Sequence, residues 1–163
     1  MTGLYKQTVP IFIHYLNNLS NLLTKGAEFA EQKEGMTEAS MLSFRLIEDM
    51  RELTFQVQGC TSIAKATPQR LDPHEVLTVE DVETALEELQ ERIKRTIEIL
   101  QTAKPEAMDA MMGNFQFATG QIYVSQYAIP SFNFHLATAY CIMRHLGVPL
   151  GAVDYLKDVF HKV

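Results

Sequence analysis

The chain has 163 residues, of which 47% are apolar and 21% are charged, and its formal net charge is −6 at pH 7. This size and composition predict one globular domain over residues 1–163, with a core that needs no disulfide or structural metal. The acidic balance and the lack of a basic stripe exclude nucleic acid as the expected partner.

The first predicted helix runs from Leu4 to Phe29. Its apolar residues recur at steps of four, three and four, which gives one buried stripe of Phe12, Leu16, Leu19 and Leu23. At about 100° per residue, His14 points nearly opposite this stripe. We therefore expect its imidazole to be exposed.

The second predicted helix runs from Thr37 to Thr67, and Pro68 ends it because the residue before a proline disfavours helical backbone. Three polar side chains lie at the border of its apolar face: Arg45, Asp49 and Gln56. Arg45 and Asp49 are four residues apart, which predicts an ion pair on one helix turn. The apolar face itself consists of Leu42, Leu46, Met50, Leu53, Val57, Cys60 and Ala64.

The third predicted helix begins at Thr78, which forms a capping box with Asp81. Its outer face is rich in glutamate and is interpreted as a solvated surface. The expected inward side chains are Val79, Val82, Leu86, Leu89, Ile93, Ile97 and Leu100.

The segment GNFQFATGQIYVSQYAIP follows, and its two short aromatic and β-branched runs around ATGQ predict a small hairpin or an extended crossover. The last long helix is expected from about Pro130 to Gly147, with a short helix from about Ala152 to Phe160. The long helix is apolar almost all the way round, which predicts burial. Its polar residues make the apolar run too short for a membrane span.

Four long amphipathic helices and one long crossover predict an all-α four-helix bundle. Three segments, YKQTVPIFIHYLNNL, RLIEDMRELTFQVQ and FNFHLATAYCIMRHLGVPLGAVDYL, resemble a family of uncharacterised bacterial proteins. That family is a domain of unknown function within the DinB/YfiT-like bundle superfamily. The resemblance covers nearly the whole chain and implies a DinB-like four-helix bundle, often as a dimer, with no assigned reaction.

Better characterised members of that superfamily bind a divalent metal through one histidine on an early helix and an HxxxH pair on the last helix. In this sequence His145 matches the second histidine of that pair, Cys141 occupies the first position, and the second helix contains no histidine. His135 and His145 are ten residues apart, roughly 15 Å along a helix, so they cannot share one ion. We therefore expect no resident metal, and the remaining candidate ligands are Cys141, His145 and Asp49.

The sequence contains no complete catalytic motif and identifies no cofactor. Two hypotheses follow from its polar residues. The first is a small-molecule-binding or enzymatic bundle with a polar cleft between helices two and four, lined by Arg45, Asp49, Gln56, His135, Thr138 and His145. The second is a non-enzymatic structural or interaction protein that acts as a homodimer, in which the same residues fix helix register.

The two cysteines, Cys60 and Cys141, lie in apolar sequence surroundings and belong to no CxxC motif. They are predicted to be free thiols, which favours a reducing compartment and therefore the cytoplasm. Cys141 and His145 are spaced as a nucleophile pair, but the alternative is a small buried thiol beside a histidine at the helix end.

Overall fold

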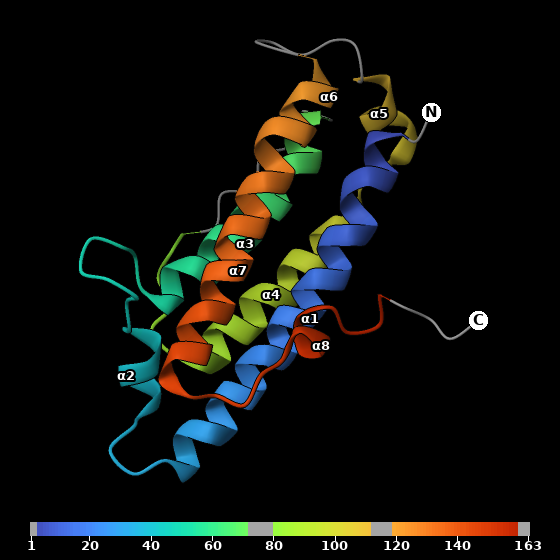
Figure 1. Cartoon of the computed structure of the whole chain (residues 1–163). Coiled ribbons are helices and arrows are strands. Elements are labelled where there is room, and N and C mark those ends of the chain that lie inside the picture. Colours follow the sequence, from blue (N-terminus) through green and yellow to red (C-terminus); the bar gives the residue numbers. More distant parts are fainter. Residues whose placement is uncertain (1–2, 72–79, 112–118, 160–163) are drawn as a thin grey trace.

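The computed structural model describes residues 3–71, 80–111 and 119–159, and it contains helices but no strand within these ranges (Figure 1). No helix in these ranges is both long and apolar enough to cross a membrane. The elements in chain order are α1 (Leu4–Gln32), α2 (Glu38–Leu42), α3 (Leu53–Leu71), α4 (Leu86–Gln101), α5 (Pro105–Ala110), α6 (Gly120–Tyr123), the π-helical turn η1 (Val124–Ala128), α7 (Ile129–Leu146) and α8 (Ala152–Tyr155).

The four long helices α1, α3, α4 and α7 form the bundle that the sequence predicts (Figure 1). Their apolar faces meet in a common core, because an amphipathic helix must bury its apolar face against another element. Phe12 of α1 and Phe132 of α7 pack there with ring centroids 4.6 Å apart, and both side chains are almost fully buried. The predicted stripe of α1 is buried throughout.

The prediction of one continuous second helix is wrong, because the backbone leaves the helix at Ser43 and re-enters it at Leu53. The Ser43 hydroxyl bonds to the carbonyl of Ala39, and side-chain bonds of this kind compete with helix continuation. The Leu53 amide then donates to the carbonyl of Phe44, which closes the intervening loop. The apolar residues keep a helical spacing through this loop, but contacts within the folded chain hold the backbone out of the helix. Pro68 also lies inside α3 instead of ending it.

Helix α4 begins at Leu86, later than the sequence predicts. The carboxylate of Glu88 accepts hydrogen bonds from the amides of Thr84 and Ala85 and so caps the first turn. Val82, which was expected to point inward, is 68% exposed. Thr78 and Val79 lie outside the described residues.

The predicted hairpin is also wrong over the residues described, because α6, η1 and α7 follow one another without a break from Gly120 to Leu146. The hydroxyl of Thr119 accepts a hydrogen bond from the Ile122 amide and starts this helical run. Aromatic and β-branched residues therefore do not prevent helix formation where they pack against the bundle. The aromatic residues Phe115 and Phe117 lie outside the described residues.

Helix α7 ends as expected at Gly147, whose positive φ of 98° is typical of a helix C-terminus. The helix is not buried all the way round, because Phe134, Ala137 and Cys141 face solvent. An exposed position for Cys141 also contradicts its interpretation as a buried thiol.

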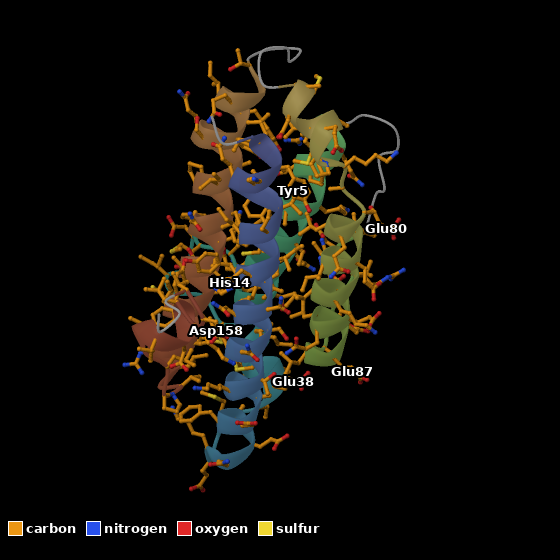
Figure 2. The ribbon with its side chains drawn as sticks, turned by 90° about the vertical axis from the view of Figure 1, so that its right-hand side faces the viewer. Tyr5, His14, Glu38, Glu80, Glu87 and Asp158 are labelled. Carbon is orange, nitrogen blue, oxygen red and sulfur yellow. The ribbon has the colours of Figure 1, made fainter. Side chains whose placement is uncertain are left out.

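The C-terminal segment around α8 covers a part of α1 that the sequence predicts to be exposed. Asn18 is 3% exposed, and its side-chain amide donates to the carbonyls of Tyr155 and Lys157. Figure 2 labels His14 and Asp158 in this region. His14 is consequently half-buried rather than exposed, and its ring packs against Tyr15. The spacing of residues within α1 does not predict this burial, because the covering segment comes from the other end of the chain.

Candidate functional site between α3 and α7

Gln56 of α3 and His135 of α7 meet between their two helices. The Oε1 atom of Gln56 lies 2.8 Å from Nδ1 of His135. The side-chain amide of Gln56 is oriented by its other end, since its Nε2 donates to the carbonyl of Arg51 at 3.0 Å. The oxygen must then face the imidazole, so Nδ1 carries the proton and donates it. This bond brings together two of the six residues expected to line a polar cleft, at a seam between α3 and α7.

Gly59 makes room for the imidazole ring. A Cβ atom at this position would lie 2.7 Å from the ring of His135, which is closer than side chains tolerate. The ring also contacts Phe55 of α3 and Phe134 of α7 at centroid distances of 5.8 and 5.2 Å. The His135 side chain is thus fixed by one hydrogen bond and three packing contacts.

Burial lowers the pKa of His135, because desolvation disfavours the charged imidazolium. A neutral ring protonated at Nδ1 leaves a lone pair on Nε2. Nε2 makes no hydrogen bond to any residue in the described ranges. The seam therefore presents a half-buried imidazole that can accept a proton or a hydrogen bond, oriented by Gln56 as a second group orients a catalytic or ligating histidine.

Two other predicted members of the cleft, Arg45 and Asp49, lie on the exposed loop between α2 and α3. Because the loop is not helical, they do not form the predicted i,i+4 ion pair. Arg45 instead lies 3.0 Å from Glu52, and that contact holds the loop near the start of α3. These residues do not line the seam.

Thr138 and His145 also do not join His135. The Thr138 hydroxyl donates to the carbonyl of Phe134, one turn earlier in the same helix. His145 is exposed at the end of α7, and its ring stacks on Phe44 at a centroid distance of 5.3 Å. The polar cleft expected from six residues is therefore reduced to the pair Gln56 and His135.

The three-histidine metal site implied by the superfamily resemblance does not fit the donors present. Within the described part of the chain, no group of three or more His, Cys, Asp or Glu residues is placed to hold a metal ion. Of the candidate ligands, Cys141 and His145 lie on the exposed end of α7, and Asp49 lies on the loop after α2.

Sequence reasoning missed a buried charge cluster on the other side of α3. Arg92 of α4 is only 5% exposed and pairs with Glu83 and Asp81 at 2.9 and 2.7 Å. The glutamate-rich face of α4 was expected to be solvated as a whole. Arg92 lies between Leu89 and Ile93, at the border of the apolar stripe of α4. This position is the sequence feature that distinguishes it from the exposed charged residues of the helix.

The chain is similar to one family of domains and to a solved structure. Residues 4–156 match the family model of a domain of unknown function, DUF1993. A crystal structure of a DinB family member protein from Shewanella denitrificans is 33% identical and has a TM-score of 0.92, and the match covers 98% of this chain and 95% of that one. No curated protein matches. The chain therefore belongs to the DUF1993 family of uncharacterised domains, within the DinB-like helical bundles.

Proposed function

We propose that this protein is a small-molecule-binding or enzymatic bundle whose site lies at the seam between α3 and α7, centred on His135. The observation that carries this proposal is the hydrogen bond from Nδ1 of His135 to Gln56, with Nε2 left available. In a histidine with a purely structural role, we expect both ring nitrogens to have hydrogen-bond partners within the protein. In this protein only Nδ1 is bonded, to Gln56, and the basic Nε2 has no partner among the described residues.

The surroundings of His135 indicate what such a ligand would look like. Phe55 and Phe134 contact the imidazole edge to face and offer apolar area to a small organic molecule. The guanidinium carbon of Arg51 lies 4.5 Å from the centre of the Phe55 ring. We expect a compact ligand with a hydroxyl or N–H donor for Nε2, which His135 would polarise as a general base.

A ligand-detected NMR screen with a library of small organic fragments tests this proposal. The variant His135→Phe removes the basic nitrogen and keeps an aromatic ring of similar shape. His145→Phe is the matched control, because His145 is an exposed histidine on the same helix. We expect fragments that bind the wild type and the control to lose binding to His135→Phe. Equal binding by both variants, or no fragment bound by the wild type, would contradict the proposal.

A second candidate function is that of a homodimeric interaction protein. The exposed face that runs from η1 into α7 carries side chains at steps of three, four, three and four, which form one stripe along this helical run. Phe134 is 57% exposed and Tyr127 is 49% exposed, and such large apolar groups favour an interface. This α7 stripe consists of Tyr127, Pro130, Phe134, Ala137 and Cys141.

Light scattering coupled to size-exclusion chromatography tests the dimer. Phe134→Glu places a charge in the middle of the α7 stripe and should convert a dimer to a monomer. Ile47→Glu is the control, because Ile47 is 60% exposed on the loop outside the stripe. A wild-type protein that is monomeric at all concentrations would exclude the dimer.

We also propose that the protein is cytoplasmic. Its two cysteines form no disulfide, and unpaired thiols persist in reducing compartments. Fractionation of the native cells with an antibody against the chain tests this, and recovery in a secreted or periplasmic fraction would contradict it.

A further inference from the structure

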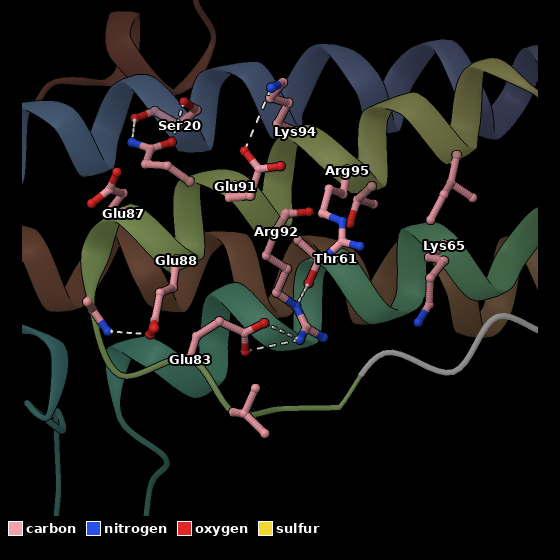
Figure 3. A pocket seen from close by; sticks show the side chains of 15 residues that line it. Ser20, Thr61, Lys65, Glu83, Glu87, Glu88, Glu91, Arg92, Lys94 and Arg95 are labelled. Carbon is pink, nitrogen blue, oxygen red and sulfur yellow. Dashed lines mark hydrogen bonds and ion pairs between the residues drawn. The ribbon is translucent and has the colours of Figure 1, made fainter.

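A surface hollow with a volume of about 990 Å³ extends across α4 (Figure 3). One part of it lies along α1, where Ser20 bonds to Gln90 of α4. Its other part lies between α3 and α4 and is lined by Thr61, Lys65 and Arg92. Figure 3 shows Glu87 and Glu91 near Ser20, whereas Lys65 lies at the opposite end. The carboxylates of Glu87 and Glu91 therefore lie away from Lys65.

Arg92 is fully engaged by its own chain. Its Nε donates to Thr61, and one terminal nitrogen donates to Glu83 and to the carbonyl of Glu80. The other terminal nitrogen pairs with Asp81 and donates to Ser62. Five donors in a fixed plane thus meet acceptors from α3 and from the segment before α4. Arg92 is therefore a structural part of the wall of this hollow.

Lys65 differs from Arg92 in this respect. It is 8% exposed, yet it makes no hydrogen bond and no ion pair with any residue in the described ranges. Most of the Lys65 side chain is thus buried without an anionic partner among the described residues, whereas most buried lysines are paired. Lys65 follows Gln56 by nine residues on α3, about 180° around the helix, so this site is separate from the seam at His135.

The local field at Lys65 favours an anion. Burial lowers the pKa of Lys65, the positive charge of Arg92 lowers it further, and Asp81 opposes them with a smaller effect. The amine therefore lies in a region where positive charge is under-compensated. A negatively charged group beside Lys65 would relieve both the desolvation and the repulsion from Arg92.

Apolar side chains lie in the same hollow. Val82 is 68% exposed and Ile99 is partly exposed, and both line it. We propose that the groove between α3 and α4 binds a small organic acid, with its carboxylate on Lys65 and its apolar body over Val82 and Ile99. The carboxylate would supply a partner for the unpaired Lys65 amine, and the apolar body would cover the exposed valine.

Calorimetric titration of the full chain with octanoate tests this proposal, with acetate, inorganic phosphate and octylamine as comparison probes. Octanoate should bind saturably and more tightly than acetate or phosphate, because only octanoate offers both a carboxylate and an apolar body. Octylamine has the same apolar body with the opposite charge and should not bind. Chemical-shift changes in an NMR titration should centre on Lys65 and Val82.

The variant Lys65→Met keeps the apolar stem and removes the charge, and it should weaken octanoate binding by about tenfold or more. Lys94→Met is the matched control, because Lys94 lines the same hollow, is exposed and pairs with Glu91. Its affinity should stay within about twofold of the wild type, and circular dichroism should show both variants folded. Absence of saturable octanoate binding by the wild type would overturn the proposal. Unchanged affinity in Lys65→Met, or phosphate or octylamine binding as tight as octanoate, would overturn it equally.

Discussion

Nδ1 of His135 on α7 lies 2.8 Å from Oε1 of Gln56 on α3, and this bond joins two polar side chains across an interface that is rich in apolar contacts. Gln56 is 2% exposed, so its amide is held within the bundle while the imidazole is only half-buried. The bond fixes one tautomer and one orientation of the ring. It makes His135 the side chain around which the proposed site is built.

Substitution of Gly59 by alanine tests how closely the ring packs on α3. The added Cβ would lie 2.7 Å from the imidazole, so His135 or the helix must move. We expect Gly59→Ala to lower the free energy of unfolding by about 1–3 kcal/mol, as other over-packed sites do. Gly151→Ala is the control, since its Cβ would meet only ordinary contacts at 3.7 Å or more. Equal urea midpoints for the two variants would contradict the packing described for His135.

The lowered pKa of His135 predicts a pH dependence of stability. The unfolded chain takes up a proton near pH 6.5, whereas the folded chain does so only at lower pH. The contribution of the neutral ring is therefore fully present above pH 6.5 and is lost as the pH falls through the folded pKa. Compared with His135→Gln, the wild type should lose stability as the pH is lowered below 6.5. Parallel curves of unfolding free energy against pH would contradict this prediction.

The helical bundle could be predicted from the sequence because burial follows the 3.6-residue period in α1, α3 and α4. The breaks in this pattern could not be predicted. The loop from Ser43 to Glu52 preserves the spacing of apolar residues but is closed by contacts such as that of Arg45 with Glu52. Contacts of this kind form only in the folded chain, so the spacing of apolar residues in the sequence does not predict them.

The candidate site was predicted in part for the same reason. Gln56 and His135 both border apolar stripes on helices that are present, so their meeting follows from the bundle. Arg45 and Asp49 were placed by assuming a helix that ends before them. Lys65 and Arg92 were missed because charged residues are normally exposed, and their burial depends on the packing of α3 against α4.

The buried pair of Arg92 and Glu83 predicts a large effect on stability. Burial alone would raise the pKa of Glu83, but hydrogen bonds from Arg92 and Gln58 outweigh it and hold the pKa below its usual value. Arg92→Met would leave this carboxylate buried without its cation, at a cost of about 3–5 kcal/mol. Lys94→Met, on the exposed face of α4, should change stability by no more than about 0.5 kcal/mol. Chemical denaturation that gave similar losses for both variants would contradict the structural role of Arg92.

The two cysteines should differ in reactivity. Cys60 is fully buried, its Sγ contacts the carbonyl of Phe132 at 3.7 Å, and burial raises the pKa of its thiol. Cys141 is exposed on α7. A thiol reagent such as dithionitrobenzoate should label one thiol of the native protein quickly and the second only after unfolding. Cys141→Ser should abolish the fast phase, and rapid labelling that remained in this variant would contradict the burial of Cys60.

The proposed site depends on His135 being a neutral imidazole that is protonated at Nδ1 and has Nε2 available. Long-range ¹H–¹⁵N NMR spectra of the histidine rings at pH 7 test it most directly, with His135→Phe used to assign the signals. We predict the Nδ1–H tautomer, a pKa below 6.5 in a pH titration, and a change in tautomer population when Gln56 is replaced by leucine. A ring protonated at Nε2, or one that titrates at or above pH 6.5, would contradict this description of His135.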